Sequence, residues 1–119
     1  MAAPNLNSPT RVVGKTARLA ATTSSQAILS NGASSNAALR VVSLVAANID
    51  GTNAADITVT TSDGTTSIAI ASTVTVPADA TLIVCGRENI LYLQEGWSLS
   101  GLASANGDIV FTANYEEIT

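Results

Sequence analysis

The side chains that could carry out chemistry are few. The chain has 119 residues, with nine Asp and Glu, five Lys and Arg, one Cys and no His. Without histidine, no side chain has an ordinary pKa suited to proton transfer near neutral pH, and no Ser or Cys has an identifiable activating base. We therefore predict no catalytic residues, no small-molecule substrate and no enzymatic activity.

One motif resembles a phosphate site. The stretch "VVGKT", residues 12–16, is similar to the end of a phosphate-binding loop. That loop requires a second glycine five residues before Gly14, where this chain has Pro9. The Gly-Lys pair also opens a predicted strand where the motif requires a helix. We reject a phosphate site, and we predict no cofactor.

A second motif offers oxygen ligands. "DGTNAAD", residues 50–56, could present carboxylate and amide oxygens to a hard cation. The EF-hand spacing would require Asp or Asn at Ala54 and Gly at Ala55. A plain loop is the favoured interpretation and a calcium site stays open as the alternative. No residue is assigned as a metal ligand.

The other potentially reactive groups have simple structural interpretations. Asp56 and Asp63 lie near predicted turns, where such carboxylates usually accept hydrogen bonds from local backbone amides. Glu116 and Glu117 are the polar end of a last strand. Cys85 lies in the apolar run "TLIVC" and is expected to be a buried, unreactive thiol.

Charge is sparse and unevenly distributed along the chain. The formal net charge is −4, and the four cations Arg11, Lys15, Arg18 and Arg40 all precede the first carboxylate. Neighbouring copies could use such an asymmetry for register or steering, and scattered solvated charges are the alternative. Four dispersed cations give no basic stripe, so we predict no nucleic acid partner. No long apolar run indicates a signal peptide or a membrane span, and we predict assembly in a cytoplasm.

The chain divides into an arm and a body. Residues 1–13 contain Pro4 and Pro9 and little to bury, which predicts an extended N-terminal arm. The arm could pack on its own domain or reach an adjacent subunit. Residues 14–119 read as short strands separated by turn residues, which indicates an all-β fold. We predict an antiparallel β-sandwich, jelly-roll-like, of about eight strands.

Turn dipeptides and alternation locate the strands. The predicted strands lie in residues 14–23, 26–30, 38–49, 55–60, 67–71, 76–85, 89–94, 96–105 and 108–118. Asp63-Gly64 closes a hairpin, and Glu95-Gly96 and Asn106-Gly107 mark further turns. The apolar run 38–49 predicts a central strand buried on both faces. Phe111 and Tyr92 are expected in the core.

The body resembles small structural proteins of tailed bacteriophages, including those of marine and cyanobacterial hosts. The residues that carry this resemblance are "VVSLVAANIDGTNAADITV", "VPADATLIV" and "ILYLQEGWSLSGLASANGDIVFTANYEEI", which span roughly two thirds of the chain. Trp97 departs from the pattern, because a polar residue is expected after the Glu-Gly turn. This departure suggests that the turn is packed against something.

The resemblance implies a virion component without enzymatic activity. A capsid decoration or cement protein is the first expectation, a neck, head-to-tail adaptor or fibre component the second, and a glycan-binding module using Trp97, Tyr92 and Tyr115 the third. Expected partners are the major capsid protein and copies of the chain itself, as a homo-oligomer for which a trimer is preferred. Candidate contact residues are Pro4, Leu6, Pro9, Arg11, Lys15, Arg18 and Trp97.

Overall fold

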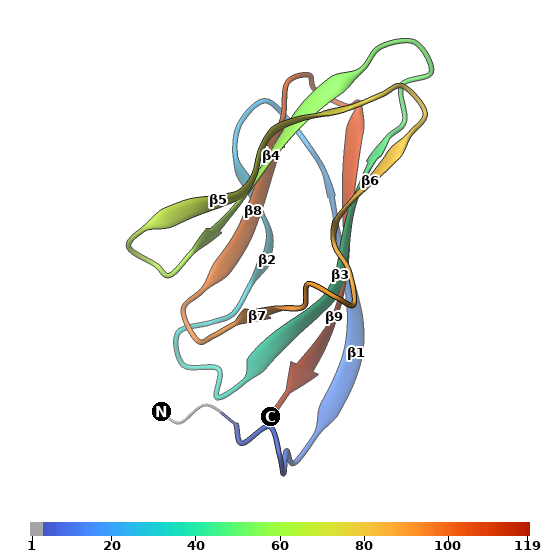
Figure 1. Cartoon of the computed structure of the whole chain (residues 1–119). Helices are drawn as coiled ribbons and strands as arrows, with labels where there is room; N and C mark the ends of the chain where they lie inside the picture. The colour runs from blue at the N-terminus through green and yellow to red at the C-terminus, as the bar shows by residue number, and fades with distance from the viewer. Residues whose placement is uncertain (1–3) are drawn as a thin grey trace.

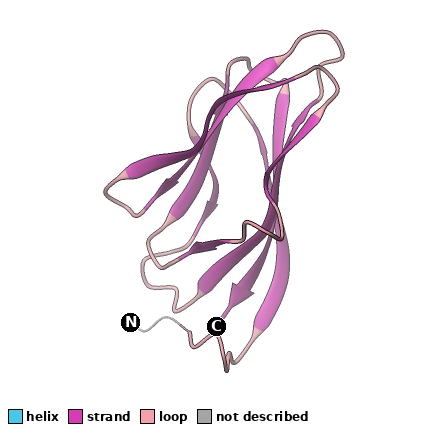
Figure 2. Ribbon diagram, viewed as in Figure 1, coloured by secondary structure: helices cyan, strands magenta, loops and turns pink. Residues whose placement is uncertain are grey.

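Two antiparallel β-sheets pack face to face in the computed structural model, which describes residues 4–119 (Figure 1). Residues 1–3, the first part of the predicted arm, lie outside the described residues. Residues 4–119 contain strands and loops but no helix, and so no helix that could cross a membrane (Figure 2). The strands are β1 (Val12–Ala20), β2 (Gln26–Ser30), β3 (Ala38–Asn48), β4 (Ala55–Ser62), β5 (Ser67–Val76), β6 (Thr81–Cys85), β7 (Leu91–Leu93), β8 (Ser98–Ala103) and β9 (Ile109–Ile118).

The strand order is that of a jelly roll. One sheet has the order β1-β9-β3-β6, with β7 also paired to β3, and the other has the order β2-β8-β4-β5. β6 and β7 pair with successive parts of β3, so together they occupy one edge position. The chain therefore forms four nested antiparallel pairs, β1 with β9, β2 with β8, β3 with β6 and β7, and β4 with β5. The predicted β-sandwich is confirmed.

The core lies between the two sheets and follows the two-residue alternation of each strand. Ile57 and Val59 on β4 and Phe111 and Ala113 on β9 belong to one cluster between the sheets, and all four are fully buried. Phe111 is the largest of the fully buried side chains. Its prediction as a core residue is confirmed.

Burial on both faces of β3 was predicted, and this is wrong. β3 is central, between β9 and the β6/β7 edge, but its residues alternate between buried and half-buried. In a two-layer sandwich each sheet has one face on the core, and the other face of β3 carries residues such as Arg40 and Val45. The apolar run arises because small Ala and Ser side chains and Val occupy that outer face.

The predicted turns occur where glycine is required. Gly64, Gly96 and Gly107 have φ values of 96°, 83° and 81°, a region that residues with a Cβ rarely adopt. The β4–β5 hairpin has a four-residue loop in which Asp63 accepts hydrogen bonds from the Thr65 and Thr66 amides at 2.9 and 2.7 Å. This arrangement orders the hairpin tip.

The first strand begins earlier than predicted. β1 includes Val12 and Val13, which the sequence assigned to the arm, and ends at Ala20. Before it, the amides of Thr10 and Arg11 donate to the Thr119 carbonyl, and the Thr119 amide donates to Arg11 at 2.8 Å. The edge of the sheet thus extends to residue 10. The described part of the arm is residues 4–9, with a turn closed by Ser8 and Asn5.

Candidate interaction surfaces

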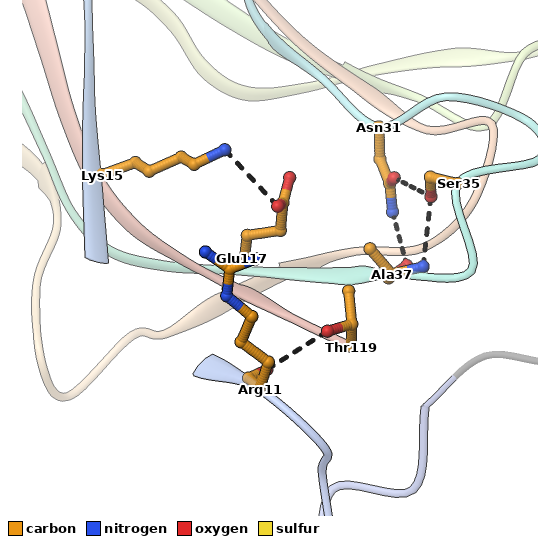
Figure 3. Close-up of polar contacts among 7 residues, drawn as sticks. All are labelled: Arg11, Lys15, Asn31, Ser35, Ala37, Glu117 and Thr119. Carbon is orange, nitrogen blue, oxygen red and sulfur yellow. Dashed lines mark hydrogen bonds and ion pairs between the residues drawn. The ribbon is translucent and has the colours of Figure 1, made fainter. Parts of the chain in front are cut away.

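The described part of the arm lies at one end of the sandwich, beside the C-terminus (Figure 1). Leu6 is 48% exposed, Arg11 is exposed, and Pro4 and Pro9 are half-buried. Backbone pairing between Arg11 and Thr119 fixes the root of the arm to the last strand. The Thr119 hydroxyl also donates to the Arg11 carbonyl (Figure 3). Residues 4–9 therefore start from a defined position and present the apolar side chain of Leu6 to solvent.

The side chains of Lys15 and Arg18 lie on opposite faces of β1 and do not form one basic patch. Alternation along β1 places Lys15 on the same face as Ala17 and Leu19, which pack on the core, and Arg18 on the opposite face. Lys15 Nζ lies 3.4 Å from Glu117 Oε1 on β9 (Figure 3). Arg18 is exposed and has no ion-pair partner within residues 4–119. Of the two, only Arg18 keeps its charge free for another molecule.

Charges that are separated in the sequence meet within the fold. Arg40 on β3 forms an ion pair with Glu116 on β9, and Lys15 pairs with Glu117. The Glu116 carboxylate, followed by Tyr92, raises the pKa of Arg40 above its ordinary value. The two glutamates therefore lie in the last strand as predicted, and both have cationic partners from early in the chain.

Trp97 is half-buried and packs against the protein's own core. It lies between β7 and β8, where its amide donates to the Gln94 carbonyl at 3.0 Å. Tyr115 is also half-buried on the core, whereas Tyr92, expected to be buried, is 41% exposed because it faces outward opposite Arg40 on β3. The three rings therefore do not form an exposed platform.

Two buried asparagines that sequence reasoning missed order the loops at opposite ends of β3. Asn31 is 5% exposed, and its Nδ2 donates to the carbonyls of Ala37 and Leu93, both at 2.9 Å. Its Oδ1 accepts from Ser35 Oγ at 2.5 Å (Figure 3). In the sequence, Asn31 and Gly32 follow a predicted strand and indicate only a turn. No local signal shows that the Asn31 side chain also reaches Leu93 on β7.

Asn48 plays the matching role at the other end. Its Nδ2 donates to the carbonyls of Asn53 and Val76, both at 3.0 Å, and its Oδ1 accepts from the Asp50 amide. The carboxylate of Asp50 accepts from the amides of Thr52 and Asn53. Hydrogen bonding from Thr52 first, and then from Asn53, lowers the pKa of Asp50. The loop 50–56 is therefore held by its own hydrogen bonds.

The groups considered for chemistry remain dispersed. Within residues 4–119 no pocket is found, and no three His, Cys, Asp or Glu residues lie together as metal ligands. Cys85 is buried as predicted, and burial raises the pKa of its thiol. Asp56 does not cap a turn as predicted, because its carboxylate accepts from Thr75 Oγ1 on the neighbouring strand at 2.7 Å.

Large apolar side chains are exposed at several places on the surface. The most exposed are Ile83 (68%), Ile68 (64%) and Ile49 (62%), and five others are at least 40% exposed. Those five are Leu6, Val12, Ile70, Ile90 and Tyr92. Most of these positions lie in loops or on edge strands, where neighbouring molecules can reach them.

Two of the solved structures that are similar to this chain are described by their source. Both are crystal structures of a pentameric capsid protein isolated from metagenomic phage sequences. They are 15% identical to this chain, with TM-scores of 0.43 and 0.41. The matches cover 87% of this chain but only 60% and 64% of theirs, so the chain spans less than two thirds of their length. With TM-scores and identities this low, the two structures give no evidence on the activity or partners of this chain.

No protein-family profile matches the sequence, and no curated protein does.

Proposed function

We propose that this chain is a non-enzymatic structural protein of a bacteriophage virion, and that it acts as a decoration protein on the outside of the capsid. The phage assignment is supported by the resemblance of the segments 41–59, 76–84 and 90–118 to virion proteins of tailed phages. A function that depends on contacts with other proteins is supported by the large apolar side chains exposed on the surface of the fold.

Exposed apolar area is the observation that carries the proposal. Full burial of one isoleucine side chain stabilises by about 1.5–3 kcal/mol. Ile49, Ile68 and Ile83 each leave more than half of that area in water, on a sandwich that has no pocket within residues 4–119. Contacts with neighbouring subunits would bury these side chains and so stabilise the complex. A chain or oligomer that makes several weak contacts at once on a symmetric shell would bind more tightly than through any one of them.

The arm supplies the second contact. Its root is fixed by pairing of Thr10 and Arg11 with Thr119, so residues 4–9 start from the edge of the sheet beside the last strand. Leu6 offers an apolar side chain, and Arg11 offers a cation that forms no ion pair within the described part of the chain. In the proposed arrangement these residues lie across a major capsid subunit or a neighbouring copy, and the sandwich covers the junction between capsomers.

Cosedimentation with purified empty shells that lack this protein tests the proposal. The full chain should bind saturably, with one copy or one oligomer per repeated shell position. Deletion of residues 1–9 should weaken binding because it removes Leu6, while Thr10 and Arg11 keep the strand pairing. No binding of the full chain to its own phage's shells would refute the decoration role. Unchanged binding after the deletion would refute only the role of the arm.

A glycan-binding role has less support. Such modules present exposed rings to sugars, and here only Tyr92 of the three candidate rings is exposed.

The oligomeric state preferred from the sequence is a trimer. Three-fold contacts on the shell would cover apolar surface on each copy.

A further inference from the structure

β1 differs from the other edge strands of the two sheets. An edge strand carries unpaired backbone groups that can pair with another chain. β2 and β5 have register shifts against their neighbours, and the β6/β7 edge is interrupted by a loop at residues 86–90. β1 pairs with β9 over all nine of its residues without a shift (Figure 1). It is therefore the regular edge of the fold within residues 4–119.

Hydrogen bonds at the two ends of β1 show which of its backbone groups are free. The backbones of Arg11 and Thr119 bond to each other, and the Ala21 amide donates to the Ile109 carbonyl at 2.8 Å. Backbone groups in an antiparallel pair alternate between the two sides of a strand, so the odd-numbered residues of β1 bond to β9 and the even-numbered ones face outward. The outward residues, all exposed, are Val12, Gly14, Thr16, Arg18 and Ala20.

A free cation and an open carboxylate lie on the outer face of this edge. Arg18 is exposed and has no ion-pair partner within residues 4–119. Gly14 lies opposite Glu116 on β9, and a Cβ added at Gly14 would meet no atom within 4 Å. Both hydrogen bonds from Arg40 end on Glu116 Oε1, so Oε2 accepts none within the described residues. Glu116 can therefore accept another donor that approaches over Gly14.

A second copy of β1 is the occupant that this edge matches. When two β1 strands pair antiparallel about Thr16, the middle residue of the strand, all nine residues of each take part. Val12, which is 47% exposed, then lies opposite Ala20 of the other copy, and each of these apolar side chains gains a neighbour. The described part of the arm is a poorer occupant, because Pro4 and Pro9 have no amide to donate.

Charge complementarity supports the same register. Arg18 lies opposite Gly14 of the other copy, and Glu116 is the next residue beyond Gly14, on β9 of that copy. The Cα atoms of Arg18 and Glu116 are then about 10 Å apart, two strand spacings, which extended Arg and Glu side chains can span. A two-fold axis at Lys15 or at Arg18 would instead place like charges opposite each other, which is destabilising.

We infer that two copies of this chain pair antiparallel through β1, with Thr16 on the two-fold axis and Arg18 of each copy bound to Glu116 Oε2 of the other across Gly14. The two sheets that contain β1 become one continuous sheet across the axis. The pairing needs no virion, so it goes beyond the proposed function, and its failure would leave that function standing.

Light scattering coupled to size-exclusion chromatography over a range of concentrations tests the inference. The full chain should have twice its 12.0 kDa mass. R18E should raise the dissociation constant of the dimer by about tenfold or more, because it sets a carboxylate against Glu116 of the other copy. Its circular dichroism should be unchanged, because Arg18 forms no ion pair with residues 4–119 of its own chain.

R87E is the matched control for this charge reversal. Arg87 is also exposed and forms no ion pair within the described residues, but it lies in the loop between β6 and β7 at the other edge of the sheet. R87E should remain dimeric. A wild-type monomer or trimer, or a dimer that R18E weakens no more than R87E does, would overturn the inference.

Cross-linking tests the register. Residues directly opposite each other in an antiparallel pair lie within disulfide distance, so T16C should form a covalent dimer under mild oxidation. A20C is the matched control, because Ala20 is exposed on the same edge but would lie opposite Val12 of the other copy, far from the second Ala20. The native Cys85 is buried. A dimer in which T16C fails to cross-link, or in which A20C cross-links as readily, would overturn the proposed register.

Discussion

Asn31 and Asn48 show how single side chains fix the ends of this sandwich. Each is buried, and each donates two hydrogen bonds to backbone carbonyls, one in the loop that follows it and one on a strand distant in the sequence. A buried carbonyl left without a donor costs about 1–3 kcal/mol. These residues therefore couple the loops to the sheets.

Replacement of Asn31 by alanine should destabilise the fold by about 1–3 kcal/mol, because the carbonyls of Ala37 and Leu93 lose their donor. Urea unfolding measures this loss. Asn89→Ala is the control, since Asn89 is exposed, and it should change stability by less than about 0.5 kcal/mol. Equal stability of the two variants would contradict the role assigned to Asn31.

Gly101 is required for packing. A Cβ at this position would lie 2.7 Å from Cε2 and 2.9 Å from Cζ of the buried Phe111 ring. Gly101→Ala should therefore cost about 1–3 kcal/mol of stability through overpacking. Gly14→Ala is the matched control, because a Cβ added there would meet no other atom within 4 Å, and it should be tolerated. If Gly101→Ala leaves the melting temperature unchanged, the packing of β8 against Phe111 is looser than described.

Two loop aspartates predict a dependence of stability on acid. Amide donors, first Thr52 for Asp50 and first Thr66 for Asp63, lower the pKa of each carboxyl in the folded state. Each carboxylate thus stabilises the fold above its unfolded pKa of about 3.9, and this contribution is lost as the pH falls through the lowered folded pKa.

Urea midpoints measured between pH 7 and pH 2 should therefore fall in the acid range, and the D50N/D63N variant should show a smaller fall. The wild-type chain measured in parallel is the reference, because the two proteins differ only in these two carboxylates. Identical profiles for the two proteins would exclude these carboxylates as the source.

At the scale of elements, alternation and turn residues were sufficient to predict most strands. The Ile57/Val59 alternation and the glycines at 64, 96 and 107 correspond to β4 and to three observed turns. The sequence could not show which strands would have a covered outer face, because that depends on the neighbouring layer. This is why β3 was predicted to be buried on both faces, and why the exposure of Ile68 and Ile70 could not be predicted.

The candidate contact residues were only partly predictable for the same reason. Exposure of Leu6 and Arg11 follows from their polar and proline-containing surroundings. The ion pair of Lys15 with Glu117 depends on β1 lying beside β9, a contact between the two ends of the chain. A local sequence pattern does not indicate which distant strand a residue will lie beside.

Truncation should separate the free part of the arm from its root. Deletion of residues 1–9 should leave the urea midpoint unchanged, because the pairing of Thr10 and Arg11 with Thr119 is kept. Deletion of residues 1–11 removes those backbone hydrogen bonds, each with a net contribution of about 0.5–1.5 kcal/mol, and should lower stability. Equal midpoints for both truncations would contradict the anchoring of the arm root.

At the scale of the whole molecule, the fold resolves the charge asymmetry of the sequence. Two early cations, Lys15 and Arg40, pair with Glu117 and Glu116 on the last strand, so the charge of these two cations is used between neighbouring strands of one sheet and is not offered to neighbouring copies. The apolar side chains at the edges remain for intermolecular contact. A small jelly roll with such edges is suited to assembly with many identical neighbours.

The number of copies per particle tests this account most directly. Under the proposed function, quantitative gel densitometry of purified virions of the source phage, calibrated against the major capsid protein, should give tens to hundreds of copies, because a decoration protein repeats with the shell. About a dozen copies or fewer would place the chain at the neck or in a fibre and contradict the decoration role. Absence from the particles would contradict the virion assignment itself.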